Sequence, residues 1–191
     1  MILIVAALAC LAVVPLTGGR LTQLLDLRLR WSGAALSALA LQVVITTLAP
    51  TGSHGLHQLL HLGSYALAGA FIVANRHVTG LPVLALGAAL NSLAIVANAG
   101  VMPASARAMQ LAGLPQTDHF ANSAPVAHPH LLALGDVIPV PGPWPLGNVI
   151  SLGDILIIAG LLSILYHACR PAASAALPSP PAEAGAAANH G

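Results

Sequence analysis

Apolar residues follow one another along this chain in long, almost unbroken stretches, with polar residues gathered in short segments between them. Such runs lack the alternation of a half-buried strand, so they predict helices that are apolar on every side. About 20 apolar residues cross a bilayer as a helix, because every backbone group is then satisfied within the segment. Five stretches fit this length: 1–17, 33–49, 56–75, 81–99 and 150–168. The pattern therefore predicts an all-α, polytopic membrane protein with about five transmembrane helices.

The segments outside these runs complete the predicted domain organisation. Residues 1–170 would form one membrane domain, with 100–149 as a long extracytoplasmic loop between spans four and five. Loops of this length without structure of their own are uncommon and are often functional. The tail 171–191 is rich in Pro and Ala and has too little large apolar surface to fold, so we expect a disordered cytoplasmic tail.

Composition and charge agree with a membrane protein and exclude one class of partner. The chain is 57% hydrophobic and 6% charged, whereas a soluble domain has about 25% charged residues. The formal net charge of +1 provides no basic patch for nucleic acid. Cys10 and Cys169 lie far apart in apolar surroundings, which argues against a disulfide framework. We therefore expect no nucleic-acid partner.

The arginines predict an orientation, because positively charged residues tend to remain on the cytoplasmic side of a span. Arg107 is the only one on the predicted outer side. Five others fall on the opposite side, after alternate spans: Arg20, Arg28, Arg30, Arg76 and Arg170. The absence of Lys and the richness in Ala, Leu and Gly are typical of a GC-rich bacterial genome. These features predict a multi-pass protein of the bacterial cytoplasmic (inner) membrane, with the N-terminus outside and the C-terminus in the cytoplasm. Its partners would be the lipid bilayer and, as an open alternative, other membrane proteins.

Polar side chains within the predicted spans favour the outer half of the membrane and share helix faces. His57 and His61 are four residues apart, and Asn91 and Asn98 are seven apart. Unsatisfied polar groups are costly in apolar surroundings, so these side chains are expected to face one another inside the bundle. They would either fasten the helices or line a polar cavity that opens outward. The candidates for this cavity are Gln42, His57, His61, Asn91, Asn98 and Asp154.

Asp154 stands at the start of the last apolar run, in "SLGDILIIAG" (151–160). Ser151 and Asp154 match a capping box, with a hydroxyl at the N-cap and an acid at the third helical position. The cap alone explains the carboxylate, and a cap that also serves a site is the alternative. Asp136 could fold back toward Asp154, and two carboxylates near one face can form a general acid/base pair.

Several stretches resemble an uncharacterised family of small bacterial integral membrane proteins, defined only as a domain of unknown function. They are "NSLAIVANAGVMP" (91–103), "LGDVIPVP", "NVISLGDIL" and "GGRLTQLLDLRLRW", within a likeness that spans roughly 1–168. The patterns N-x-x-x-I-x-x-N-x-G-x-M-P and S-L-G-D are its most specific parts. Ala99 and Val101 depart from the family's tendency toward paired glycines. The family has no assigned activity, so the resemblance implies membership and no mechanism.

A weaker resemblance concerns the lipoprotein signal peptidase, which has two Asp residues near the outer face of the membrane. Here Asp136 is followed by Val137 where that enzyme has Arg, and Asn148 lies six residues before Asp154 where the enzyme has three. Asp136 and Asp154 are catalytic candidates only under this reading, that of an intramembrane aspartyl hydrolase.

The functional prediction is an integral membrane protein without catalytic activity, a membrane or accessory protein whose polar cavity opens to the outer face. The alternatives are the intramembrane hydrolase and a small proton-coupled carrier that uses Asp154 and His61. The sequence shows neither an H-E-x-x-H motif nor a Cys pair, and the His-x-His of His128 and His130 is a weak signal. We therefore expect no metal and no cofactor.

Overall fold

A computed structural model describes residues 2–47, 54–114, 123–124, 126, 128–142 and 147–170. The α-helices of this part are α1 (Ile2–Leu16), α2 (Ser32–Thr47), α3 (His54–Ala74), α4 (Leu81–Ala97), α5 (Ala106–Leu111) and α6 (Leu152–Ala168). Two 3-10 helices, η1 (Leu21–Asp26) and η2 (Leu132–Leu134), join them. The short strands are β1 (Met102–Pro103), β2 (Ser123–Ala124), β3 (Ile138–Val140) and β4 (Asn148–Ile150). β1 and β2 pair in parallel, and β3 and β4 pair antiparallel with Pro139 opposite Val149.

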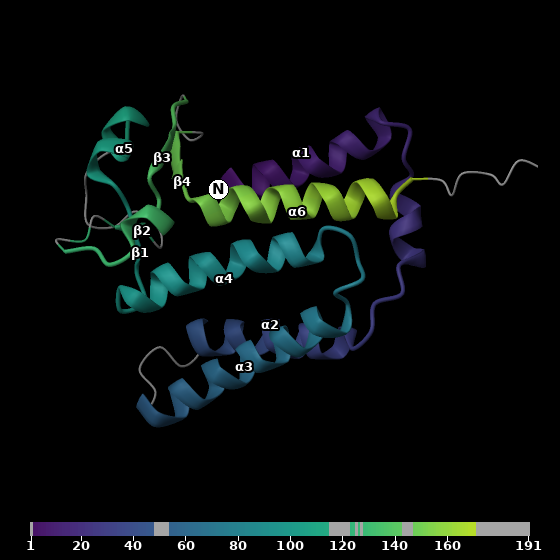
Figure 1. The fold of residues 1–191 in the computed structure, drawn as a ribbon, viewed down its shortest axis with the longest axis horizontal. Helices are drawn as coiled ribbons and strands as arrows, with labels where there is room; N and C mark the ends of the chain where they lie inside the picture. Colours follow the sequence, from purple (N-terminus) through teal and green to yellow (C-terminus); the bar gives the residue numbers. More distant parts are fainter. Residues whose placement is uncertain are drawn as a thin grey trace, which may run out of the picture.

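α4 occupies the middle of the helical arrangement (Figure 1). It packs along α6 on one side, and the α2–α3 pair lies on its other side. α1 packs against the far side of α6, while α5 and the strands gather at the end where α6 begins. α4 packs far more extensively on α6 than on α3, so the α2–α3 pair is the more loosely attached part of the fold.

Two small groups of apolar side chains form the core. One joins α1 to the end of α6 and consists of Cys10, Val14, Leu165 and Cys169. The other holds α5 against the strands and consists of Ala104, Ala108, Met109, Ala112 and Val149. Many large apolar side chains remain outside these groups, such as Leu16 at 83% exposure and Leu36 at 67%. The exposed apolar surface is therefore spread over several helices.

Local sequence signals begin and end the central helices. Gly80 precedes α4 with a φ of +96°, a value that glycine adopts without strain, and Pro82 stands in the first turn. Asn98 caps the end of α4, and its backbone N–H donates to the carbonyl of Ile95. Ser151 caps the start of α6, and Cys169 closes its end. These signals limit both helices to 17 residues.

The helix lengths overturn the predicted transmembrane topology. α1, α2, α4 and α6 contain 15, 16, 17 and 17 residues. At about 1.5 Å per residue the longest of these spans about 26 Å, short of the roughly 30 Å of a hydrocarbon core. α3 has 21 residues, but its N-terminal half contains three His and a Gln. Within the ranges that the structure describes, no helix combines the length and the apolar character needed to span a membrane.

The fold prediction was therefore wrong in its membrane part, although the chain is mainly helical. The five transmembrane helices expected at 1–17, 33–49, 56–75, 81–99 and 150–168 are contradicted, and so is the location as a multi-pass inner-membrane protein with the N-terminus outside. The physical reason is that the prediction rested on the number of consecutive apolar residues, whereas caps and turns determine where each helix ends. The predicted tail 171–191 lies outside the described residues.

Candidate functional site

The structure distributes the predicted polar-cavity residues over three places. Asn91 and Asp154 meet between α4 and α6, Asn98 lies at the end of α4, and Gln42 lies between α2 and α3. His57 and His61 belong to α3, but their side chains are outside the described part of the structure. Of the candidates with described side chains, only Asn91 and Asp154 are brought together. The other two each belong to a different contact.

Asn91, Ser151 and Asp154 form a closed ring of hydrogen bonds. The Ser151 hydroxyl accepts from the backbone N–H of Asp154 at 3.0 Å, and the Asp154 carboxylate accepts from the backbone N–H of Ser151 at 3.2 Å, which is the predicted capping box. Asn91 extends it: its Nδ2 donates to Asp154 Oδ1 at 2.7 Å, and its Oδ1 accepts from the Ser151 hydroxyl at 2.8 Å. Asp154 is 8% exposed. The carboxylate thus fastens α4 to the first turn of α6.

Two pairs of glycines bring the backbones of α4 and α6 into close contact. A Cβ on Gly87 would lie 2.5 Å from the carbonyl oxygen of Gly153, and one on Gly80 would lie 2.5 Å from that of Gly160. Real Cβ atoms do not approach other atoms so closely, so these four positions require glycine. This contact was not predicted from the sequence. Its signal is a spacing of seven residues in each helix, from 80 to 87 and from 153 to 160.

Two asparagines act as clamps, because a side-chain amide can pair with both backbone groups of one distant residue. Asn98 Oδ1 accepts from the N–H of His130 at 2.9 Å, and its Nδ2 donates to the carbonyl of His130 at 2.7 Å. Asn75 pairs with Arg30 in the same way, at 2.8 and 2.7 Å. Asn75 is fully buried and was not singled out from the sequence. It ties the end of α3 to the segment before α2.

Asp136 is buried in the segment between η2 and β3. Its backbone pairs in parallel with that of Ala104, as in a β-sheet. Its N–H donates to the carbonyl of Pro103 at 2.9 Å, and its carbonyl accepts from the N–H of Ser105 at 3.0 Å. Residue 136 thus helps to hold the segment after α4 in place, whereas Asp154 lies in the contact between α4 and α6. The pairing of Ile138 with Ile150 places the Asp136 segment beside the residues that lead into α6.

An open groove of about 740 Å³ is bordered by α2, α3 and α4. Its walls are mostly Ala, Leu, Ile, Phe and Val, and small residues such as Ala88 and Gly69 leave the space open. Four of its residues are polar: Gln42, Ser64, Tyr65 and Ser92. Gln42 Nε2 donates to the hydroxyl of Ser64 at 2.7 Å, and Ser64 is 1% exposed. The groove is therefore mainly apolar, and two of its four polar residues are joined by this hydrogen bond.

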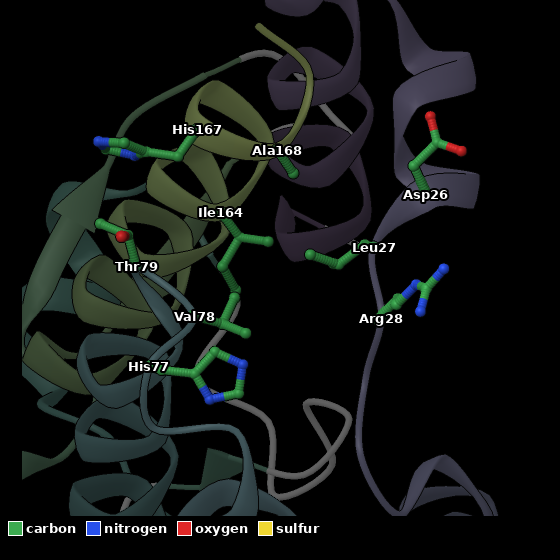
Figure 2. A pocket seen from close by; sticks show the side chains of 9 residues that line it. All are labelled: Asp26, Leu27, Arg28, His77, Val78, Thr79, Ile164, His167 and Ala168. Carbon is green, nitrogen blue, oxygen red and sulfur yellow. The ribbon is translucent and has the colours of Figure 1, made fainter. Parts of the chain in front are cut away.

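A smaller cavity of about 330 Å³ lies where η1, the turn before α4 and the end of α6 meet. In Figure 2 the side chains of Leu27, Val78 and Ile164 turn toward one another. Arg28 points away from them on one side and His167 points away on the other. The side chains of Arg28 and His167 therefore do not converge on the cavity.

Comparison with known proteins places most of the chain within one family description. Residues 26–166 match the model of a "Family of unknown function (DUF5317)", a range that contains the groove, the ring at Asp154 and the four close-contact glycines. A protein of Thermotoga maritima named "Uncharacterized protein" is 34% identical over 108 residues. That alignment covers 56% of this chain and 62% of the relative, so the chain spans less than two thirds of the relative's length. No solved structure matches the chain.

Proposed function

We propose that this chain, which belongs to DUF5317, a family of unknown function, is a non-enzymatic binding protein. Its groove between α2, α3 and α4 would accept an apolar small molecule. The single observation behind this proposal is the groove itself. Its volume of about 740 Å³ falls in the range of roughly 300–1,000 Å³ that is usual for ligand sites. Apolar walls with a few placed polar groups are also typical of such sites.

The chemistry of the groove favours binding over catalysis. The described residues that line it supply an amide, hydroxyls and a phenol, without a carboxylate, an imidazole or a thiol. A general acid or base must come within hydrogen-bond reach of the substrate. Asp154 lies elsewhere and is engaged by Asn91 and Ser151. The hydrolase alternative, which needs Asp136 and Asp154 as a pair, therefore has less support than a binding function.

The test uses an uncharged naphthalene dye whose fluorescence rises in apolar surroundings. Ala88 lines the groove, so Ala88→Trp should fill part of it and lower the dye affinity at least about tenfold, a change of about 1.4 kcal/mol. The matched control is Leu8→Trp on α1, where the side chain is 60% exposed and lies outside the groove. Equal dye affinity in both variants and the wild type would overturn the proposal.

A further inference from the structure

Exposed arginines gather at one end of the fold, although they come from separate segments of the chain. They follow α1, η1, α3 and α6, whose ends lie together on the right in Figure 1. The N–H of Arg20 donates at 2.9 Å to the carbonyl of Cys169, the residue before Arg170. The clamp by Asn75 holds Arg30 beside Arg76. We call this surface the basic end, and its arginines are Arg20, Arg28, Arg30, Arg76 and Arg170.

The basic end is strongly positive, and the described acids lie mostly elsewhere. Asp26 is the one acidic side chain among the described residues of these four segments. Asp136 and Asp154 lie at or before the start of α6, at the opposite end of the molecule. Arg107 also lies there, on α5. The distribution of charge therefore distinguishes one end of the molecule from the other.

Large apolar side chains are exposed among these arginines. Leu24 of η1 packs against the core group that contains Val14 and Leu165. A 3-10 helix has three residues per turn, so Leu25 points about 120° away from Leu24 and faces outward. Leu25 is 87% exposed and Trp31 is 64% exposed. The basic end thus presents cations and apolar groups side by side.

The backbone holds Trp31 in its exposed position. Its φ of +57° lies in the left-handed region, which residues other than glycine rarely adopt. On one side the buried Asn75 fixes both backbone groups of Arg30, at 2.8 and 2.7 Å. On the other side the N–H of Ala34 donates to the carbonyl of Trp31 at 2.8 Å. Such a conformation persists only where its surroundings determine it, so the fold itself keeps this large aromatic side chain at the surface.

From this combination we infer that the basic end docks on the surface of an anionic phospholipid bilayer. The donors of arginine match the geometry of phosphate groups. Leu25 and Trp31 would enter the boundary between headgroups and acyl chains, where tryptophan is enriched. An acidic polypeptide would match the arginines and leave these apolar side chains exposed. Docking of this kind needs no helix that crosses the bilayer, and it is independent of ligand binding in the groove.

The experiment measures co-sedimentation of the full chain with two kinds of vesicle, phosphatidylcholine alone and phosphatidylcholine with an equal part of phosphatidylglycerol. Arg28→Gln removes one charge of the basic end, and Arg107→Gln is the matched control on α5, where the side chain is also exposed. Leu25→Ser has a similar control in Leu111→Ser, at the exposed end of α5. The chain has two tryptophans, so Trp144→Phe leaves the fluorescence of Trp31 as a report of entry into lipid.

We expect the wild-type chain to bind the anionic vesicles at least about tenfold more tightly than the others, and high salt to remove this difference. Arg28→Gln should weaken binding about fivefold, the contribution of one arginine near an anionic surface. Leu25→Ser should weaken it at least about threefold, and both controls should bind as the wild type does. The emission of Trp31 should shift to shorter wavelength on anionic vesicles.

Equal affinity for the two kinds of vesicle would overturn docking on anionic lipid. Equal effects of Arg28→Gln and Arg107→Gln would do the same, because binding would then not depend on the basic end. Tight binding of poly-glutamate without binding of anionic vesicles would also overturn it, and would assign the basic end to an acidic protein instead.

Discussion

At the scale of single residues, Asn91 turns a local helix cap into a contact between distant parts of the chain. Ser151 and Asp154 satisfy the first turn of α6 by themselves. The amide of Asn91 then gives a donor to Asp154 and an acceptor to Ser151, from 63 and 60 positions away. Ser151 and Asp154 are buried, so removal of one partner leaves a buried polar group without its hydrogen bond.

Substitution of Asp154 should therefore cost more than the loss of a cap. Asp154→Ala leaves two donors unsatisfied, the amide of Asn91 and the backbone N–H of Ser151. We expect a loss of about 2–4 kcal/mol in the free energy of unfolding, because a buried unsatisfied group costs about 1–3 kcal/mol. Chemical denaturation measures this value. Ser151→Ala, which leaves the carboxylate in place, should cost less, at about 1–2 kcal/mol.

A double-mutant cycle between Asn91→Ala and Asp154→Ala separates the contact from the cap. Residues that share a hydrogen-bond network show coupling energies of about 0.5–3 kcal/mol. We expect a coupling of at least about 1 kcal/mol for this pair. If the two losses in the free energy of unfolding simply add, Asn91 and Asp154 are not coupled, and Asp154 stabilises only its own helix.

At the scale of the element, α4 presents two different faces. Gly80 and Gly87 bring one face against the backbone of α6. Ala85, Ala88 and Ser92 turn the other face toward the groove. Glycine lowers the stability of an isolated helix by roughly 0.5–1 kcal/mol relative to Ala, so its presence here is explained by the close approach of the two backbones.

Gly87→Ala tests this contact directly. The new Cβ would lie 2.5 Å from the carbonyl oxygen of Gly153 and 2.8 Å from the backbone nitrogen of Ile157, and neither atom belongs to a flexible side chain. We expect a loss of about 1–3 kcal/mol, measured as a lower Tm, because overpacking forces the helices apart. Gly63→Ala is the matched control in α3, where nothing lies within 4 Å of the added Cβ. It should stabilise the protein by roughly 0.5–1 kcal/mol. Equal effects of the two substitutions would contradict the close α4–α6 contact.

At the scale of the whole molecule, the helices divide into a tightly packed group and a more loosely attached pair. α1, α4 and α6 form the group, and α2 and α3 pack mainly on each other. The clamp from Asn75 to Arg30 fixes the pair at one end, and the groove separates much of it from α4. Regions with fewer buried contacts open more readily than the core does.

Amide hydrogen exchange should reveal this division. We expect the backbone amides of α2 and α3 to exchange faster than those of α4 and α6. Asn75→Ala should widen this difference, because the backbone of Arg30 then loses both hydrogen bonds to Asn75. Asn98→Ala is the control, since it releases the same kind of clamp at His130 and should leave α2 and α3 unchanged. Uniform exchange throughout the helices, unaffected by Asn75→Ala, would contradict the loose attachment of the pair.

The extent to which the sequence predicted these features depends on how local each feature is. Apolar runs located the helices, so that the run at 150–168 coincides with α6 from Leu152 to Ala168, and the S-L-G-D pattern identified its cap. The transmembrane assignment failed because α1, α2, α4 and α6 contain only 15 to 17 residues and the first half of α3 contains three His and a Gln. The partnership of Asn91 with Asp154 joins residues 63 positions apart, and no local pattern specifies such a pairing. The groove likewise depends on how the α2–α3 pair lies against α4.

The two faces of α4 also restrict how this helix can change in length. An inserted residue turns every later residue by about 100° around the helix axis. Placed between Gly80 and Gly87, it would rotate Gly87 and Asn91 away from α6 and, in the same step, rotate the groove wall from Ala88 to Val96 out of the groove. A single event would thus break both surfaces. The rotation of α4 about its own axis is therefore fixed along its length. A substitution, by contrast, changes only one of its two faces.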